Sequence, residues 1–289
     1  MAIVDEFSNI SLGTLNELTI NSELSKKITK TKVETEPYPH FILENLLSER
    51  DLNFIRENWP DERFFAPDIE HTYTCEPQRN WKEIPHWTTF MATKGVEITT
   101  AVVQNFSPWI DARYGRDSQI IVRWAGCMQS DATYKGHGCH THHYHDPLWV
   151  GTVLFYVDED TSGYPGTTMF GSTLPPRDIS NEARLASDTL FWFNSPEIAK
   201  VREVSYKPNR VFAFLDSPIS YHGVPPSGET SGMRRIMRFH IGMENRFHSE
   251  KYGCDQTKYR EIRWEGKKYQ DMDSVINWLV RDLEELWSV

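Results

Sequence analysis

Histidines are concentrated in one short stretch of this chain. The segment CHTHHYHDP, residues 139–147, holds four of the eleven histidines, and His137 lies just upstream. Neutral imidazole is the commonest metal-binding side chain at physiological pH. Residues two apart on a strand face the same side, so His143 with His145, or His140 with His142, can point together into a sheet interior. The stretch therefore predicts part of a metal site.

A distant histidine has the setting expected of a third ligand. The segment NRVFAFLDSPISYHGVPP predicts a strand and a turn, and then His222 among glycine and prolines. Two ligands close in sequence and one distant ligand make a three-point site that leaves other coordination positions open for substrate. We therefore expect His222 to meet one pair from the cluster.

The elements that must position these histidines are mainly strands. Short runs rich in valine, isoleucine and aromatic residues, separated by turn residues, begin near residue 119 and are typical of a β-sandwich or barrel. The predicted strands are 119–129, 149–157, 189–194, 202–207, 210–216 and 234–242. A further strand is expected at residues 40–46, before the turn that leads into the first helix.

Helices are predicted on both sides of the strand block. Ser48 followed by Asp51 is an N-cap pattern for a helix that ends before Pro60. Helical spacing of apolar residues predicts a second helix over 94–115 and a last one over 271–287. We expect an N-terminal arm or short helix over residues 1–36 and a single α+β domain over 37–289, with the β-sandwich core at about 119–245.

Composition argues against several classes of partner. The 31 basic and 41 acidic residues give a net charge of −10, and no basic run stands out, which disfavours nucleic acid. The N-terminus lacks a signal-peptide pattern, and the longest apolar run is far too short to span a membrane. The four cysteines are widely spaced, so we expect reduced thiols and a cytoplasmic protein.

Several segments together resemble a known enzyme family. HYHDPLWVGTVLFYVDED followed by GYPGTTMFG, and the distal YKPNRVFAFLDSPISYHGVPPSGETSGMRRIMRFHI, are similar to the iron(II)/2-oxoglutarate-dependent oxygenases, in particular their prolyl-hydroxylase-like branch. The resemblance covers residues 37–245. It implies a double-stranded β-helix (jelly-roll) core with flanking N-terminal and C-terminal helices, Fe(II) and 2-oxoglutarate as cofactors, and dioxygen as co-reactant.

The chain departs from the family at one metal ligand. The family's first motif is His-x-Asp or His-x-Glu, but no carboxylate stands two residues after any histidine of the cluster. Ungapped comparison of the following strand places His145 where the acid should be, so we predict His143, His145 and His222 as the catalytic metal ligands. Asp146 can replace His145 if the turn bulges, and His140 with His142 is the other pair.

The resemblance also implies a basic residue that binds the distal carboxylate of 2-oxoglutarate. The family carries it on the strand after the distal histidine, where this chain has Arg234, Arg235 and Arg238. Neighbouring strand residues face opposite sides, so only one of Arg234 and Arg235 can point inward. We predict Arg234 as the cosubstrate-binding residue and Arg238 as a possible substrate contact. The aromatic residues Trp149 and Tyr156 fit core positions.

The predicted function is hydroxylation of a small-molecule substrate by a 2-oxoglutarate-dependent dioxygenase. The missing carboxylate leaves two alternatives open. One is a cupin-like three-histidine metalloenzyme that does not use 2-oxoglutarate. The other is a non-catalytic binding module on the same scaffold.

Overall fold

The structure is a computed structural model. It describes residues 22–67, 72–75, 83–114, 116, 118–130, 136–140, 149–158, 164–172, 198–217, 220–226 and 233–243. The described helices are α1 (Glu23–Thr29), α2 (Glu49–Glu57), α4 (Pro85–Phe90), α5 (Val96–Asn105) and α6 (Ser107–Tyr114), with a 3-10 turn η3 (Glu62–Phe64) and a π-helical turn η5 (Met91–Gly95). The described strands are β1 (His40–Glu44), β2 (Ala66–Pro67), β3 (Thr72–Cys75), β4 (Ile120–Ser130), β5 (His137–His140), β6 (Trp149–Tyr156), β7 (Thr167–Ser172), β8 (Ile198–Val204), β9 (Arg210–Leu215), β10 (His222–Val224) and β11 (Arg234–Met243).

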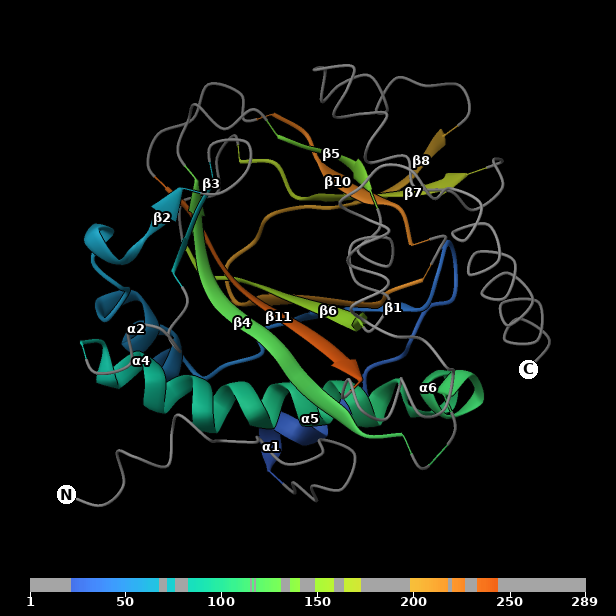
Figure 1. Ribbon diagram of the computed structural model, residues 1–289, viewed down its shortest axis with the longest axis horizontal. Helices are drawn as coiled ribbons and strands as arrows, with labels where there is room; N and C mark the ends of the chain where they lie inside the picture. Colours follow the sequence, from blue (N-terminus) through green and yellow to red (C-terminus); the bar gives the residue numbers. More distant parts are fainter. Residues whose placement is uncertain are drawn as a thin grey trace, which may run out of the picture.

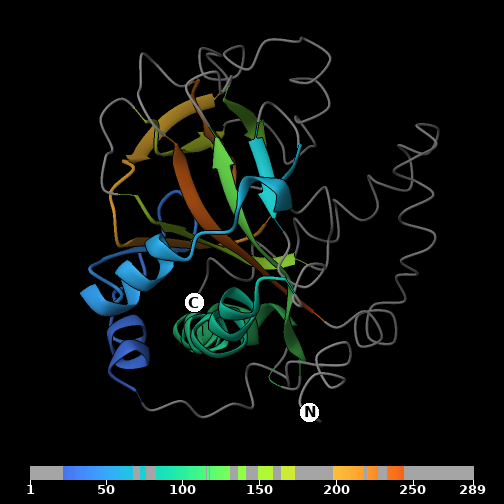
Figure 2. The same cartoon turned by 90° about the vertical axis from the view of Figure 1, so that its left-hand side faces the viewer.

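The described elements form three layers. A seven-stranded sheet has the order β1-β9-β6-β11-β4-β3-β2, and a four-stranded sheet has the order β5-β10-β7-β8. Helices α1, α5 and α6 lie below the larger sheet, and the smaller sheet lies above it (Figure 1, and from the side in Figure 2). Neighbouring strands in both sheets are antiparallel, for example β6 with β9 and β7 with β10. The mixture of helices and antiparallel sheets confirms the predicted α+β class.

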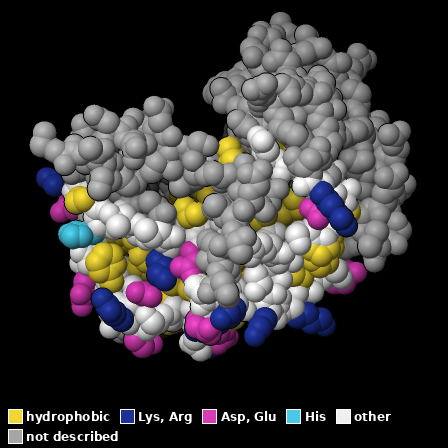
Figure 3. Space-filling model, turned by 90° about the horizontal axis from the view of Figure 1, so that it is seen from below, with side chains coloured by type: hydrophobic (Ala, Val, Ile, Leu, Met, Phe, Trp, Pro, Cys, Tyr) yellow, Lys and Arg dark blue, Asp and Glu magenta, His cyan; other side chains and the backbone are white. Residues whose placement is uncertain are grey.

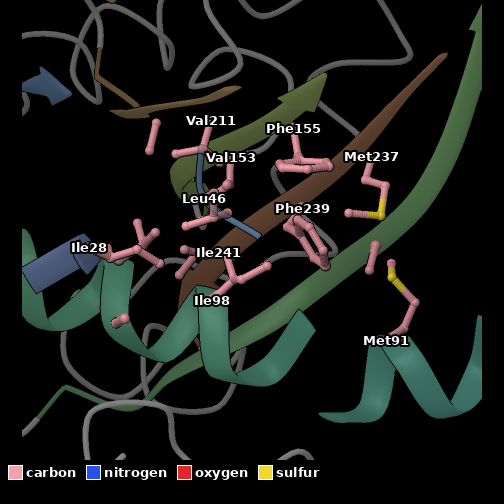
Figure 4. Packing of buried hydrophobic residues seen from close by; sticks show 14 of the residues in the cluster. Ile28, Leu46, Met91, Ile98, Val153, Phe155, Val211, Met237, Phe239 and Ile241 are labelled. Carbon is pink, nitrogen blue, oxygen red and sulfur yellow. The ribbon is translucent and has the colours of Figure 1, made fainter. Parts of the chain in front are cut away.

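Alternation along the strands separates two hydrophobic clusters. In β6, Val153 and Phe155 belong to the cluster that faces the helices, whereas Leu154 and Tyr156 belong to the cluster between the sheets. The strand β11 alternates in the same way, with Met237, Phe239 and Ile241 on the helix side. Figure 4 shows Ile241 and Phe239 above Ile98 of α5, and Met237 above Met91. Leu154 and Tyr156 of β6 and Ile236 of β11 therefore face the interior between the two sheets.

The smaller sheet closes this interior from the other side. Met169 of β7 and Val204 of β8 share one buried cluster with Phe212 and Phe214 of β9, which belongs to the larger sheet. Both sheets thus bury one face against each other, as in a sandwich. Polar side chains that point into this space are shielded from water and need partners there.

The helix predicted to begin after Ser48 agrees with the structure, whereas the second predicted helix differs from it. Ser48 caps α2, and its hydroxyl accepts a hydrogen bond from the Asp51 amide at 3.2 Å. The helix predicted over 94–115 is instead two helices, α5 and α6, with Phe106 between them. Pro108 lies in the first turn of α6, where its missing N–H is tolerated, whereas inside one continuous helix it would remove a hydrogen bond.

The predicted strands also agree, with one shift. The strands expected at 119–129, 149–157, 210–216 and 234–242 correspond to β4, β6, β9 and β11. The strand expected at 202–207 begins earlier, because β8 runs from Ile198 to Val204. The strand expected at 189–194 and the helix expected at 271–287 lie outside the described residues.

Part of the predicted N-terminal arm is packed against the domain. Helix α1 lies within residues 1–36, and its Leu24 and Ile28 belong to the buried cluster beneath the larger sheet. Figure 3 views the molecule from the side on which α1 and α5 lie, and basic and acidic side chains are interspersed over its described part. Lys26 pairs with Glu23 on α1 at 3.0 Å, an exposed pair that contributes little to stability.

Candidate metal and cosubstrate site

Two histidines from remote segments meet in the smaller sheet. His140 is the last residue of β5 and lies directly opposite His222, the first residue of β10. Their ring centroids are 4.3 Å apart, and both side chains are buried. Pairing of these two short strands is therefore what brings the histidine cluster to the distal histidine.

The ring of His222 is held in one orientation. Its Nδ1 lies 2.8 Å from the backbone oxygen of Ser220, which can only accept, so Nδ1 carries the proton. The ring packs against Phe214, with centroids 4.6 Å apart. A histidine that donates from Nδ1 to a carbonyl has its Nε2 lone pair directed outward, the arrangement typical of metal-ligating histidines.

Of the predicted ligand set, His222 lies within the described residues. His143, His145, His142 and Asp146 lie outside the described residues, so the predicted set His143, His145 and His222 stays a prediction. His140, from the alternative pair, is the cluster residue that contacts His222. Within the described ranges, no three histidine, cysteine or acidic residues gather in a way that could hold a metal.

Arg234 and Arg235 point to opposite sides of β11, as the alternation predicts. Arg234 is 4% exposed, and its Nε donates to the Pro165 carbonyl at 3.2 Å. Arg235 turns to the outer side, where its guanidinium lies 3.7 Å from Asp158 and 5.6 Å from the Trp59 ring centre. Arg234 is therefore the arginine that faces the interior.

The guanidinium of Arg234 is surrounded by aromatic rings. Its carbon lies 5.5 Å from the centre of the Tyr206 ring and 5.9 Å from that of Tyr156. Among the described residues, no carboxylate comes within 4.0 Å of its nitrogens, although charged side chains are rarely buried without such a partner. This environment fits an anionic ligand that supplies the missing charge.

Three side-chain hydroxyl groups belong to residues around this arginine. Tyr156 and Thr167 share a hydrogen bond of 2.9 Å, and burial raises the pKa of Tyr156, so its phenol stays protonated. Ser130 is the register partner of Arg234 on β4, and its buried hydroxyl has no hydrogen-bond partner among the described residues. A buried hydroxyl left without a partner is destabilising, so a ligand that accepts from Ser130 would gain affinity.

A second polar group lies in the interior, near the other end of β11. The hydroxyl of Thr152 donates to Asp216 at 2.8 Å and lies 3.1 Å from Nδ1 of His240. Trp149 stacks on His240 with centroids 4.0 Å apart. Burial raises the pKa of Asp216 to about 7, against the opposing effects of Thr152 and Arg113. This group could not be predicted from the sequence, because its members come from three separate segments.

No protein-family model and no curated protein matches this chain. Solved structures similar to it include an oxidoreductase of the 2OG-Fe(II) oxygenase family from Burkholderia pseudomallei. That protein is 10% identical, covers 78% of this chain and 92% of its own, and has a TM-score of 0.44. A prolyl hydroxylase from Trichoplax adhaerens, in complex with a peptide of hypoxia inducible factor, is 11% identical, covers 79% and 92%, and has a TM-score of 0.45.

HygX from Streptomyces hygroscopicus, solved with nickel, 2-oxoglutarate and hygromycin B, is 13% identical, covers 77% of this chain and 87% of its own, and has a TM-score of 0.43.

 The first of these structures is named as a member of the 2OG-Fe(II) oxygenase family and the second as a prolyl hydroxylase, and HygX was solved with 2-oxoglutarate bound. Among the described residues, no helix is long and apolar enough to cross a membrane.

Proposed function

We propose that this protein is an Fe(II)/2-oxoglutarate-dependent dioxygenase with a double-stranded β-helix core, which hydroxylates a small-molecule substrate. One observation carries the proposal. Arg234 is buried between the two sheets without a carboxylate partner among the described residues, and the facing sheet holds the contacting pair His140 and His222. A buried cation and a buried imidazole pair in one interior fit a ligand with a carboxylate at one end and metal-binding oxygens at the other.

The proposed metal ligands are His222, His140 and one further side chain from residues 141–148. His142 would share the side of His140 if β5 continued as a strand. His143 and His145, the ligands predicted from the sequence, are the other candidates. Imidazole suits Fe(II), and the protonated Nδ1 of His222 leaves Nε2 as the ligand atom.

Arg234 would bind the distal carboxylate of 2-oxoglutarate through two parallel hydrogen bonds, which the planar guanidinium favours. The hydroxyl of Ser130 would donate a hydrogen bond to the same carboxylate. The apolar side chains of Leu154, Met169 and Ile236, which share the interior cluster, would exclude water from this end of the site. When bound, Fe(II) with 2-oxoglutarate and dioxygen supplies oxidative decarboxylation and oxygen transfer to a C–H bond.

The test is formation of succinate. Protein loaded anaerobically with Fe(II) is mixed with 2-oxoglutarate, exposed to dioxygen with a panel of candidate small molecules, and assayed for succinate. We expect succinate from the wild type and less than a tenth as much from His222→Ala, whereas His86→Ala, which alters an exposed histidine, should behave like the wild type. Iron binding without 2-oxoglutarate binding would favour the cupin-like alternative, and binding of neither would favour a non-catalytic module.

A further inference from the structure

We propose that Tyr206 is a positioning residue that fixes the direction of Arg234 and thereby sets the affinity of the pocket for a dicarboxylate. The inference rests on the proposed function, because 2-oxoglutarate is the dicarboxylate in question. Tyr206 follows β8 in the chain and is 5% exposed. It lies far from Arg234 in the sequence, and the two meet only in the folded protein.

The ring of Tyr206 contacts the guanidinium directly. The guanidinium carbon lies 5.5 Å from the ring centre, within the range of a cation–π interaction. Tyr206 also packs against Tyr156, with centroids 4.8 Å apart, and Tyr156 is the second ring near Arg234. Two rings beside a planar cation restrict its tilt, so its N–H groups remain directed at one place in the interior.

The hydroxyl of Tyr206 fixes the backbone next to Arg234. It donates to the Arg235 carbonyl at 2.7 Å and accepts from the Asp158 amide at 3.2 Å. A phenol has one proton, so the 3.4 Å approach to the Asp158 carboxylate is not a second donated bond. Tyr206 therefore ties the start of β11 to the end of β6.

Asp158 completes this arrangement from the outer side. Its carboxylate accepts from the Arg235 amide at 2.8 Å and lies 3.7 Å from the Arg235 guanidinium. Arg235 is thus held on the outer side through its amide, its carbonyl and its side chain. Since neighbouring strand residues face opposite ways, the same contacts hold Arg234 toward the interior.

Two substitutions separate the ring from the hydroxyl. Tyr206→Phe keeps the ring and removes both hydroxyl contacts, and Tyr206→Leu removes the ring as well. Calorimetry under anaerobic conditions would give the Kd of Fe(II), and then of 2-oxoglutarate for the Fe(II)-loaded protein. We expect 2-oxoglutarate to bind about threefold to tenfold more weakly to Tyr206→Phe, and still more weakly to Tyr206→Leu. The Kd of Fe(II) should stay within about twofold of the wild type, because Tyr206 lies at the Arg234 end of the interior.

Thr99→Val is the matched control. Thr99 loses a buried hydrogen bond of 2.8 Å to the Gly95 carbonyl, but it lies in α5 on the helix side, so 2-oxoglutarate binding should not change. Unchanged 2-oxoglutarate affinity in both Tyr206 variants would overturn the inference, as would an equal loss of Fe(II) and 2-oxoglutarate binding. Failure of the wild type to bind 2-oxoglutarate would instead overturn the proposed function, and the inference with it.

Discussion

His140 and His222 lie directly opposite each other on two short strands, with ring centroids 4.3 Å apart. This contact joins the histidine-rich stretch to the distal histidine that the sequence singles out. Because β10 has only three residues and lies between β5 and β7, the pairing of the smaller sheet fixes where His222 sits. The proposed metal site depends on this pairing more than on either histidine alone.

The two neighbouring arginines of β11 should differ sharply in their effect. Arg234→Met removes the interior cation, and we expect 2-oxoglutarate affinity to fall on the order of 100-fold, about 3 kcal/mol, because a charged hydrogen-bonding partner is lost. Arg235→Met removes an outward side chain and should change the affinity by less than about fivefold. Calorimetric titration of the Fe(II)-loaded variants measures both. Equal effects of the two substitutions would contradict the assignment of Arg234.

Ser130 should affect binding without supporting the fold. Ser130→Ala removes a buried hydroxyl that has no hydrogen-bond partner in the part of the chain that the structure describes, so the free energy of unfolding should stay within about 0.5 kcal/mol or rise. The same change should weaken 2-oxoglutarate binding about threefold to tenfold, because the ligand carboxylate loses a donor. Urea unfolding and calorimetry test the two halves. A clear loss of stability with unchanged 2-oxoglutarate affinity would show that the hydroxyl serves the fold.

Asp216 should make stability fall as the pH rises. Burial raises its pKa from 3.8 to about 7, so the folded protein keeps a proton that the unfolded chain releases near pH 4. The folded state therefore binds more protons between these values, and the free energy of unfolding decreases across that window. The pKa shift of Asp216 corresponds to a loss of roughly 4 kcal/mol in the free energy of unfolding across the whole pH window.

Asp216→Asn should remove most of this dependence. The difference in unfolding free energy between variant and wild type, measured with urea at pH 5 and at pH 8, should move in favour of the variant by about 2 kcal/mol or more. Above pH 7 the protonated Asp216 no longer contributes to the free energy of unfolding, so the measurement at pH 8 reports the protein with Asp216 ionised. Unfolding curves that respond identically to pH in both proteins would contradict the prediction.

The sequence allowed the inward-facing residues to be predicted where strands are long. The alternation of β11 separates Arg234 from Arg235, although only the structure shows which of them faces the interior. Helix α2 could be predicted from its Ser48 cap, and the break before α6 could have been predicted from Pro108. These signals are local, and they predict the structure correctly because the helices and strands that carry them bury the faces that the signals indicate.

Which individual residues of remote segments contact each other could not be predicted from the sequence. The sequence could not single out the contact of His140 with His222, because the register between β5 and β10 depends on how two short strands pair in the folded protein. Tyr206 gave no local signal, since its contacts to Arg234 and Asp158 join the ends of three different strands. The core position expected for Tyr156 is correct, but its hydroxyl contact to Thr167 is visible only in the structure.

Cys75 and Cys127 should react slowly in the folded protein. They lie directly opposite each other on β3 and β4, both are buried, and both carry reduced thiols. Burial raises the pKa of Cys127, and the neighbouring Cys75 adds to the shift, so little reactive thiolate forms. At pH 8, iodoacetamide should leave both unmodified in native protein and label both in urea, as peptide mass spectrometry would show. Rapid native labelling of Cys127 would contradict the buried placement.

The proposed site is tested most directly by binding Fe(II) and then 2-oxoglutarate to the protein under anaerobic conditions. The visible charge-transfer absorption of the resulting complex reports whether 2-oxoglutarate has bound to the iron. The wild type and His86→Ala should bind one Fe(II) and develop the band on addition of 2-oxoglutarate. His140→Ala and His222→Ala should each weaken Fe(II) binding on the order of 100-fold and lose the band. Wild-type Fe(II) affinity and an unchanged band in both of these variants would contradict the proposal that the two histidines hold the metal.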